Sequence, residues 1–352
     1  MRACKQRQIS RSKITVLRWF AAFITIFFTY WLVATNFVIR DFFDPQYSMK
    51  YGLLRDRIAE NPGKPLWLVV GTSRTDHGLR PSLIENKTQT GGTPLIFNFG
   101  MSGSDLFRQY ICIKRILKDG VKPQRIGIEI LPPLLSQEES YFITTKSLVV
   151  RARWNELDDF RRFTASPEQM LDTWKESRSN PFYKLGFKAD GQTLPTWRLI
   201  VPPSLLKNRE ASQHLDRWGW MKIMPASVTR TDYLKGLEIA REHFAPMLKD
   251  FKVTLHSELV MDELLELCEK SGIDVFLLLM PESADFRQIY PEQATPEIAA
   301  FLERAKKIHG VQIIDARPWI ETEYFRDGHH LTATGAEKFT KRFAEELFKP
   351  AY

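Results

Sequence analysis

Five short apolar runs recur along the chain, and between them lie longer segments in which apolar and charged residues are mixed. Runs that are nearly continuous in apolar character are typical of strands buried on both faces of a parallel sheet. The segments between them predict amphipathic helices, which cover such a sheet. The alternation of strand and helix therefore predicts a doubly wound α/β sandwich. We expect strands at 65–70, 94–100, 125–131, 273–280 and 311–315, and helices at 103–118, 256–270, 296–308 and 334–348.

One long interval, residues 136–251, interrupts this alternation. It has no strong strand pattern and is polar, helical in places and rich in Trp and Arg. We therefore expect residues 64–135 and 252–352 to form the α/β domain and residues 136–251 to form a mainly helical insertion. Five of the nine tryptophans lie in the insertion and either form its own small core or provide a surface for carbohydrate stacking or partner docking: Trp154, Trp174, Trp197, Trp218 and Trp220.

The amino terminus differs in character from the rest of the chain. Residues 1–18 carry six basic residues and no acidic one, and residues 19–39 then contain no charge over 21 positions. Such a run is long enough to span a bilayer, and it exceeds the apolar core of about 7–15 residues found in a cleaved signal peptide. The sequence predicts a cytoplasmic tail (1–18), a transmembrane signal anchor (19–39) and a juxtamembrane linker (40–63).

Basic residues before the anchor predict a cytoplasmic amino terminus. The protein is then single-pass in a cytoplasmic or inner membrane, with its carboxy-terminal domain extracytoplasmic, either periplasmic or extracellular. The tail also carries six of the positive charges behind the formal net charge of +8, so only a small excess remains on the rest of the chain. A nucleic-acid partner is therefore not expected. Cys112 and Cys268 lie in predicted helices and are expected to be buried free thiols.

Two polar segments follow predicted strands, where ligands gather at the carboxyl edge of a doubly wound sheet. GTSR at 71–74 places Ser73 in a tight turn after the first strand. NFGMSGSD at 98–105 follows the second strand, and its glycines let backbone N–H groups approach a ligand. The simpler interpretation of both segments is a helix cap, by Ser73 in the first and by Ser104 or Asp105 in the second.

A third segment, FRDGHHLTATGAEKF at 325–339, places Asp327 three residues before His330. This pair supplies what a serine nucleophile needs, because the imidazole accepts the hydroxyl proton and the carboxylate fixes the imidazole tautomer. His77 lies four residues after Ser73, but no acid is obviously placed to orient it, so His330 is the expected base. Thr334 and Glu337 predict a capping box for the helix that follows.

In this order the three segments resemble the SGNH, or GDSL-like, hydrolase superfamily. The resemblance covers about residues 64–135 and 270–348, and it implies a three-layer α/β/α sandwich with a five-stranded parallel sheet. It also implies an acyl-serine mechanism on esters, often acetyl esters of carbohydrates. Matched position by position, Ser73 corresponds to the nucleophile, Asp327 and His330 to the rest of the triad, and the amides of Ser73 and Gly103 to the oxyanion hole.

One departure from the family pattern concerns its third block. That block normally ends a strand with Gly-x-Asn-Asp, whose Asn donates to the oxyanion, whereas Pro132 and Pro133 stand here. Proline has no N–H to offer, and losing one oxyanion donor costs about 2.7–4 kcal/mol. Either another residue supplies the hydrogen bond or activity is weak. Four residues near the strand ends are expected in the pocket, with the two arginines as sources of positive charge: Arg74, Asn98, Glu282 and Arg287.

A membrane-anchored branch of the superfamily, involved in acylation of envelope polysaccharide or teichoic acid, is similar in its anchor, its GxSR first block and its degenerate third block. The similarity implies a serine esterase or O-acyltransferase that acts on acylated carbohydrate outside the membrane. The expected partners are the membrane, through residues 19–39, and a membrane acyltransferase or polysaccharide-export protein. No cofactor or metal is expected.

Two other functions stay open. Asp327, His329 and His330, together with Asp76 or His77, offer ligands for a metal-dependent hydrolase. Against this, adjacent histidines point apart in most backbone conformations. Alternatively, the chain is a non-catalytic accessory protein that binds a glycan or a membrane partner through the Trp-rich insertion. The missing third-block Asn favours this last hypothesis, and the joint presence of all three triad residues opposes it.

Overall fold

The centre of the protein is a five-stranded parallel sheet, as the apolar runs predict. The computed structural model describes residues 11–33, 44–85, 93–138, 149, 151–179, 188–189, 192–193 and 214–349. The strand order is β2-β1-β3-β6-β7, and each neighbouring pair is parallel. The strands are β1 (Leu66–Gly71), β2 (Leu95–Gly100), β3 (Arg125–Glu129), β6 (Asp274–Leu279) and β7 (Gln312–Asp315), within two residues of each predicted boundary.

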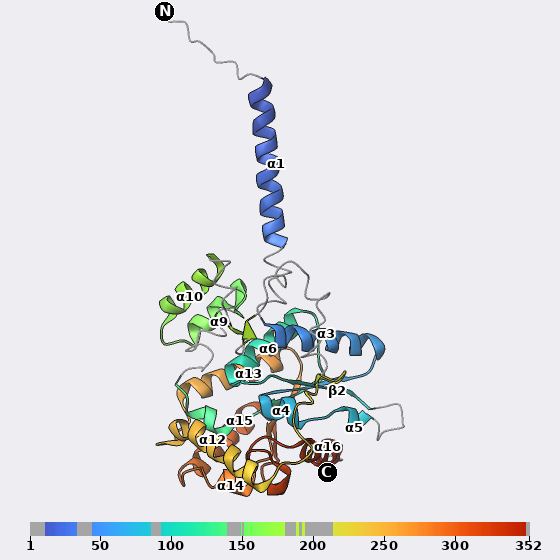
Figure 1. Ribbon diagram of the computed structural model, residues 1–352, viewed down its shortest axis with the longest axis vertical. Helices are drawn as coiled ribbons and strands as arrows, with labels where there is room; N and C mark the ends of the chain where they lie inside the picture. Colours follow the sequence, from blue (N-terminus) through green and yellow to red (C-terminus); the bar gives the residue numbers. More distant parts are fainter. Residues whose placement is uncertain are drawn as a thin grey trace, which may run out of the picture.

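The helices that alternate with these strands fall into two packed groups (Figure 1). One group is α6 (Leu106–Lys118), α13 (Leu255–Lys270) and α15 (Ala294–His309). The other is α4 (Ser73–Gly78), α5 (Ser82–Glu85) and α16 (Ala333–Leu347). The crossover from β1 to β2 runs in the opposite direction along the sheet from the later crossovers, so right-handed connections put α4 and α5 on one face and α6, α13 and α15 on the other. Helix α16, which follows the last strand, packs on α4 and α5. The predicted doubly wound α/β architecture is confirmed.

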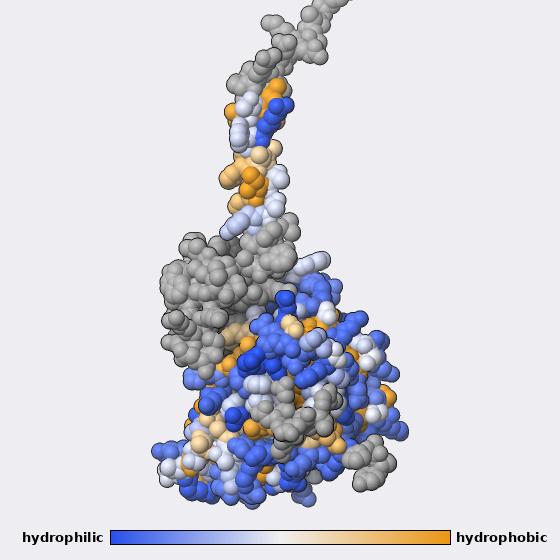
Figure 2. Space-filling model, turned by 90° about the vertical axis from the view of Figure 1, so that its right-hand side faces the viewer, coloured by the Kyte–Doolittle hydropathy of each residue, from blue (hydrophilic) through white to orange (hydrophobic). Residues whose placement is uncertain are grey.

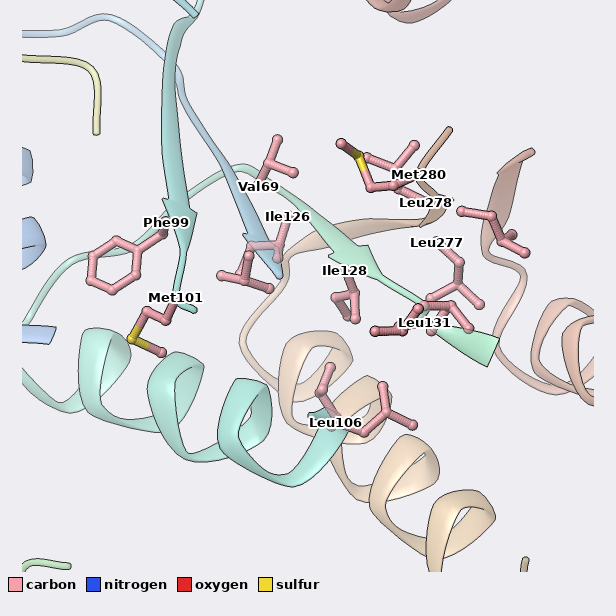
Figure 3. Close-up of a cluster of buried hydrophobic side chains, with 14 of the residues drawn as sticks. Val69, Phe99, Met101, Leu106, Ile126, Ile128, Leu131, Leu277, Leu278 and Met280 are labelled. Atoms are coloured by element: carbon pink, nitrogen blue, oxygen red, sulfur yellow. The ribbon is translucent and has the colours of Figure 1, made fainter. Parts of the chain in front are cut away.

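The core lies where the carboxyl halves of the strands meet the first helix group. Phe99, Ile126 and Ile128 lie on the face of the sheet toward Leu106 at the start of α6, whereas Val69, which pairs with Gly127, points to the opposite face (Figure 3). All of these side chains are buried. β2 is buried along its whole length, and β1 nearly so. Burial on both faces removes the need for a polar face, which explains the continuous apolar runs.

Helix α1 (Arg11–Val33) is long and apolar enough to cross a membrane over Lys13–Tyr30, by length and composition. It projects away from the folded body, and Figure 2 shows its apolar residues exposed along the helix while the surface of the body is largely hydrophilic. The helix begins eight residues before the predicted span 19–39, and its first turns include Arg11, Lys13 and Arg18. Residues 34–39 of the predicted span lie outside the described residues.

The segment predicted as a juxtamembrane linker contains a helix, α3 (Pro45–Glu60), which is attached to the sheet domain by buried charges. Asp44, its N-cap, forms ion pairs with Arg108 and Arg115 of α6 at 3.5 and 2.9 Å. Lys50 Nζ lies 2.7 Å from Asp76 Oδ1 of α4. Breaking one partner of a buried ion pair typically costs about 3–5 kcal/mol, so α3 is held firmly against the α/β domain.

The interval 136–251 is mainly helical where the structure describes it. Its elements include η3 (Trp154–Glu156), α9 (Leu157–Arg162), α10 (Pro167–Ser179) and α12 (Arg230–Leu248), with a two-stranded antiparallel pair, β4 (Lys188–Ala189) and β5 (Gln192–Thr193). Helix α13 follows α12 in the chain and carries Cys268, while α6 carries Cys112. Both cysteines are buried and free, as predicted.

The tryptophans of this interval do not form one core of their own. Trp220 is 3% exposed and its indole N–H donates to the His77 carbonyl at 2.8 Å, while Arg80 stacks over its ring. Trp218 lies under Arg57 of α3. These two therefore pack on residues 57–80, and the small-core interpretation is wrong for them. Trp154 is 73% exposed, Trp174 donates to Ala152, and Trp197 lies outside the described residues.

Candidate active site

The turn between β1 and α4 presents Ser73 as the first residue of the helix. Thr72 is the N-cap, and its hydroxyl accepts from the Arg74 amide at 3.1 Å. Ser73 is therefore not the capping residue, so the helix-cap interpretation of this serine is wrong. In the second segment Asp105 is the cap of α6 and accepts from the Arg108 amide at 2.8 Å. The hydroxyl of Ser73 is left to face the loop before α16.

A buried carboxylate fixes this turn, and sequence reasoning missed it. Glu129, the last residue of β3, is fully buried and accepts from the Thr72 amide at 2.7 Å and the Thr72 hydroxyl at 2.9 Å. It also accepts from the Thr75 hydroxyl at 2.6 Å and the Thr75 amide at 3.3 Å. Gly71 permits this approach, since a Cβ there would collide with the Glu129 carboxylate. A Glu inside a buried apolar strand was the available signal, because an isolated buried charge is costly.

Ser73, His330 and Asp327 form a continuous hydrogen-bonded chain. Ser73 Oγ lies 2.7 Å from His330 Nε2, and His330 Nδ1 lies 2.9 Å from Asp327 Oδ2. The His330 backbone amide also donates to Asp327 Oδ1 at 2.8 Å. The structure thus brings together the three residues that the sequence assigned to a triad, from two segments more than 250 residues apart. These contacts are within the range that nucleophilic catalysis requires, about 2.6–3.2 Å.

The loop that carries Asp327 and His330 is a short antiparallel turn between η5 (Thr322–Tyr324) and α16. Phe325 and Leu331 pair across it, and the Arg326 amide donates to the His330 carbonyl at 2.8 Å. Gly328 has φ +88°, which favours glycine. The predicted capping box of the last helix is wrong, because Thr332 is its N-cap and accepts from the Gly335 amide.

The surroundings of Asp327 favour its ionised form. Burial alone would raise the pKa of Asp327, but the neighbouring His329 and His330 and the hydrogen bonds from His330 outweigh it and hold that pKa below its usual value. Burial lowers the pKa of His329 well below the ordinary value, and nearby His330 lowers it further. The ionised Asp327 favours the His330 tautomer that carries its proton on Nδ1, which leaves Nε2 to accept from Ser73.

The expected oxyanion donors lie at the edge of the same cavity. Ser73, as the first residue of α4, has an amide with no acceptor inside the helix. Gly103 has φ +73° and lines the cavity together with Ser73. In place of the third block, Pro132 begins the 3-10 helix η2 (Pro132–Ser136). Gln137 follows η2 and, among the described residues that line the cavity, carries the one side-chain amide.

The four residues predicted for the pocket lie beneath it and do not line it. Arg74 is buried against Glu282 at 3.2 Å and donates to the carbonyls of Met280 and Pro281. Asn98 donates to the carbonyls of Thr75 and Leu79, both at 2.7 Å, so it ties α4 to β2. Arg287 donates to the Glu282 and Arg317 carbonyls. These side chains bind partners inside the protein and do not line the cavity.

His77 belongs to a separate buried network. Its ring lies 6.1 Å from that of His330, between centroids, and burial lowers its pKa. Neighbouring Asp76 binds Lys50 and accepts from the Ser102 hydroxyl at 3.2 Å. Ser73 is hydrogen-bonded to His330, so the expectation that His330 outranks His77 as the base agrees with the geometry.

Asp327, His329 and His330 also lie close enough to hold a metal ion, with one candidate ligand atom of each within 4.8 Å of the others. The two imidazole rings are 4.0 Å apart between centroids, so the expectation that they point apart is wrong for this loop. However, both ring nitrogens of His330 are already hydrogen-bonded, to Asp327 and Ser73. The donor set therefore fits the triad better than it fits a metal.

A cavity of about 340 Å³ opens beside the triad. Thr72, Ser73, Gly103, Asp327 and His330 line the end of the cavity at the candidate triad. The rest of its wall comes from α12, from the segment around η2, and from Ser104, Asp105 and His329. The part from α12 and the η2 segment is mostly apolar. This contribution of α12, which belongs to the interval predicted as an insertion, was not predicted from the sequence.

Comparison with known proteins gives one partial match. A model of an uncharacterised protein family matches residues 229–351, roughly a third of the chain. The matched part runs from α12 to the end of α16, so it includes Asp327 and His330 and excludes Ser73. No curated protein matches the chain.

Proposed function

We propose that the protein is a membrane-anchored serine acyl-ester hydrolase or O-acyltransferase of the SGNH type. The observation that carries the proposal is the chain of hydrogen bonds from Ser73 through His330 to Asp327, at 2.7 and 2.9 Å. The parallel sheet and the cavity beside Ser73 support it, because such sites form at the carboxyl edge of a doubly wound sheet.

In the proposed reaction Ser73 Oγ attacks the acyl carbon of an ester while His330 Nε2 accepts the hydroxyl proton. The amides of Ser73 and Gly103 donate to the oxyanion that forms on the carbonyl oxygen. His330 then donates its proton to the leaving alcohol, and an acyl-serine remains. Water or a sugar hydroxyl, deprotonated by His330, releases the acyl group and restores the serine.

The proposed substrate is an acylated carbohydrate of the cell envelope or of an exported polysaccharide. The support is the candidate membrane helix α1 and the resemblance to the membrane-anchored branch of the superfamily. In this proposal the catalytic domain is extracytoplasmic, and a membrane acyltransferase or polysaccharide-export protein is its partner.

The second candidate is a non-catalytic accessory protein that binds a glycan or a membrane partner. The observation that favours it is η2, where Pro132 and Pro133 occupy the position of the missing oxyanion Asn. An accessory protein requires no activated serine, so reactivity of Ser73 separates the two candidates.

A fluorophosphonate serine probe tests the proposal on the full chain in lipid nanodiscs. We expect the wild-type protein to be labelled, and labelling to disappear in Ser73→Ala and His330→Ala. Two exposed residues remote from the cavity provide matched controls: Ser271→Ala and His214→Ala should label like the wild type. Absence of labelling in a wild-type protein whose circular dichroism shows a folded α/β domain would favour the accessory-protein function.

A further inference from the structure

The cavity beside Ser73 is much larger than an acetyl group requires. Its volume is about 340 Å³, whereas three heavy atoms occupy roughly three times the 30 Å³ that a water molecule takes in the liquid. We propose that this cavity binds the acyl chain of the substrate, and that the preferred chain is linear and apolar, with about six to ten carbons. The inference rests on the proposed function and specifies its acyl group.

One helix provides the longest apolar wall. The α12 residues that line the cavity are Gly236, Ile239, Ala240, His243, Phe244 and Met247. Their spacing of three and four residues places them in one stripe along the helix. The stripe runs over three turns, so it can follow an extended chain. Ile239, which is 67% exposed, marks the solvent side of this wall, and Phe244 is buried.

Two leucines provide the other side of the cavity. Leu131 ends the stretch after β3, and Leu134 lies in η2. This is the place where the family pattern would have its polar third block. Prolines and leucines stand there in this sequence, so this side of the cavity is more apolar than the family pattern would make it.

The acyl chain of the substrate would begin at Ser73, because α12 lies directly against the loop that carries Asp327 and His330. At Gly236 an added Cβ would be 2.8 Å from the Cβ of Asp327, so the helix backbone approaches as closely as a glycine allows. At Gly328 an added Cβ would be 2.8 Å from Leu237 of the same helix. The acyl carbon at Ser73 and the apolar stripe therefore belong to one continuous cavity.

The chemistry of the wall favours an acyl chain over a sugar ring. Sugar hydroxyls buried without hydrogen-bond partners are unfavourable. Away from the triad loop and the turn that carries Ser73, the polar side chains in the described wall are Ser104, Asp105, Gln137 and His243, and the Asp105 carboxylate already accepts from the Arg108 amide. In contrast, each buried methylene strengthens binding by about fourfold. An octanoyl ester has several more methylenes than an acetyl ester, so we expect its kcat/KM to be higher by about 10²-fold or more.

The test measures kcat/KM for p-nitrophenyl esters from acetyl to dodecanoyl with the full chain in lipid nanodiscs. We expect a maximum between hexanoyl and decanoyl. Ala240→Phe fills the cavity and should lower the octanoyl-to-acetyl ratio by at least tenfold, whereas Met247→Ala lengthens it and should move the maximum to longer chains. Ile308→Ala, an apolar truncation on an exposed face of α15, is the matched control and should leave the ratio unchanged.

A second measurement does not depend on catalysis. Ser73→Ala should bind octanoate at least tenfold more tightly than acetate in a calorimetric titration, and Ala240→Phe should remove this difference. One outcome would overturn the acyl-chain inference and leave the serine chemistry standing. In that outcome the probe labels the protein, kcat/KM is highest for the acetyl ester, and Ala240→Phe does not change the octanoyl-to-acetyl ratio. If no ester is hydrolysed and no serine is labelled, the proposed function itself fails.

Discussion

Glu129 connects the sheet to the turn that carries Ser73, and its removal should reduce the proposed activity although Glu129 does not line the cavity. Its carboxylate accepts four hydrogen bonds from Thr72 and Thr75, the residues on either side of Ser73 and Arg74, at 2.6–3.3 Å. Arg74 Nε lies 3.7 Å from the same carboxylate. Glu129→Ala leaves these buried donors without an acceptor, at about 1–3 kcal/mol for each unsatisfied group.

The expected loss of stability for Glu129→Ala is about 4–5 kcal/mol, where the lower end of the cost of four unsatisfied donors meets the usual cost of removing one partner from a buried charge cluster. The expected loss of kcat/KM is about 10²-fold, because a displacement of the nucleophile by about 1 Å is enough for that. Such a displacement breaks the 2.7 Å contact between Ser73 and His330. Glu129→Gln retains one acceptor oxygen and should fall between Ala and the wild type in both properties.

The assay combines ester hydrolysis with thermal unfolding followed by circular dichroism. Asp262→Ala is the matched control, because Asp262 also forms a close ion pair, with Arg304 at 2.6 Å, but on α13 and outside the cavity wall. It should lose some stability and keep full kcat/KM. Wild-type activity in a folded Glu129→Ala protein would refute the argument that this carboxylate positions Ser73.

Three further predictions concern the triad and its surroundings. Asp327→Asn should lower kcat by about 10⁴-fold, because the wrong imidazole tautomer then faces Ser73; a loss below tenfold in hydrolysis assays would contradict this role. The pKa of Asp327 is lowered on folding, so its contribution to stability is present above the unfolded value of about 3.9 and is lost as pH falls further. The difference in Tm between the wild type and Asp327→Asn should therefore be constant above about pH 5 and shrink below about pH 4. Gln137→Ala should lower kcat by about 10²-fold if its amide replaces the missing oxyanion Asn, and an unchanged kcat would leave the oxyanion to backbone amides alone.

The order of the elements and the candidate triad could be predicted from the sequence. Continuous apolar runs mark strands that are buried on both faces, and this pattern depends on local composition alone. The turns at Ser73 and at Asp327 were recognisable for a similar reason, because glycine and small polar residues at strand ends indicate tight turns. The triad chemistry requires only residue types and order, and both are visible in the printed sequence.

The partners of buried side chains could not be predicted in the same way. Arg74 and Asn98 look like pocket residues from their positions, yet each has its hydrogen bonds inside the protein. Glu129 looks like an ordinary strand residue, yet it holds the turn that carries Ser73. The direction of a side chain depends on which segments pack around it, and those segments are distant in sequence.

The parallel sheet, the apolar amino-terminal segment and the residue types of the candidate triad could be predicted because they depend on local pattern. The position of α12 against the loop of Asp327 and His330, where it provides an apolar wall for the cavity, became visible in the folded chain. Nothing in the local pattern of residues 230–248 distinguishes a helix that lines the cavity beside Ser73 from a helix over any other apolar surface. That placement depends on close packing between segments that are separated in the chain, with Gly236 and Gly328 as the points of contact.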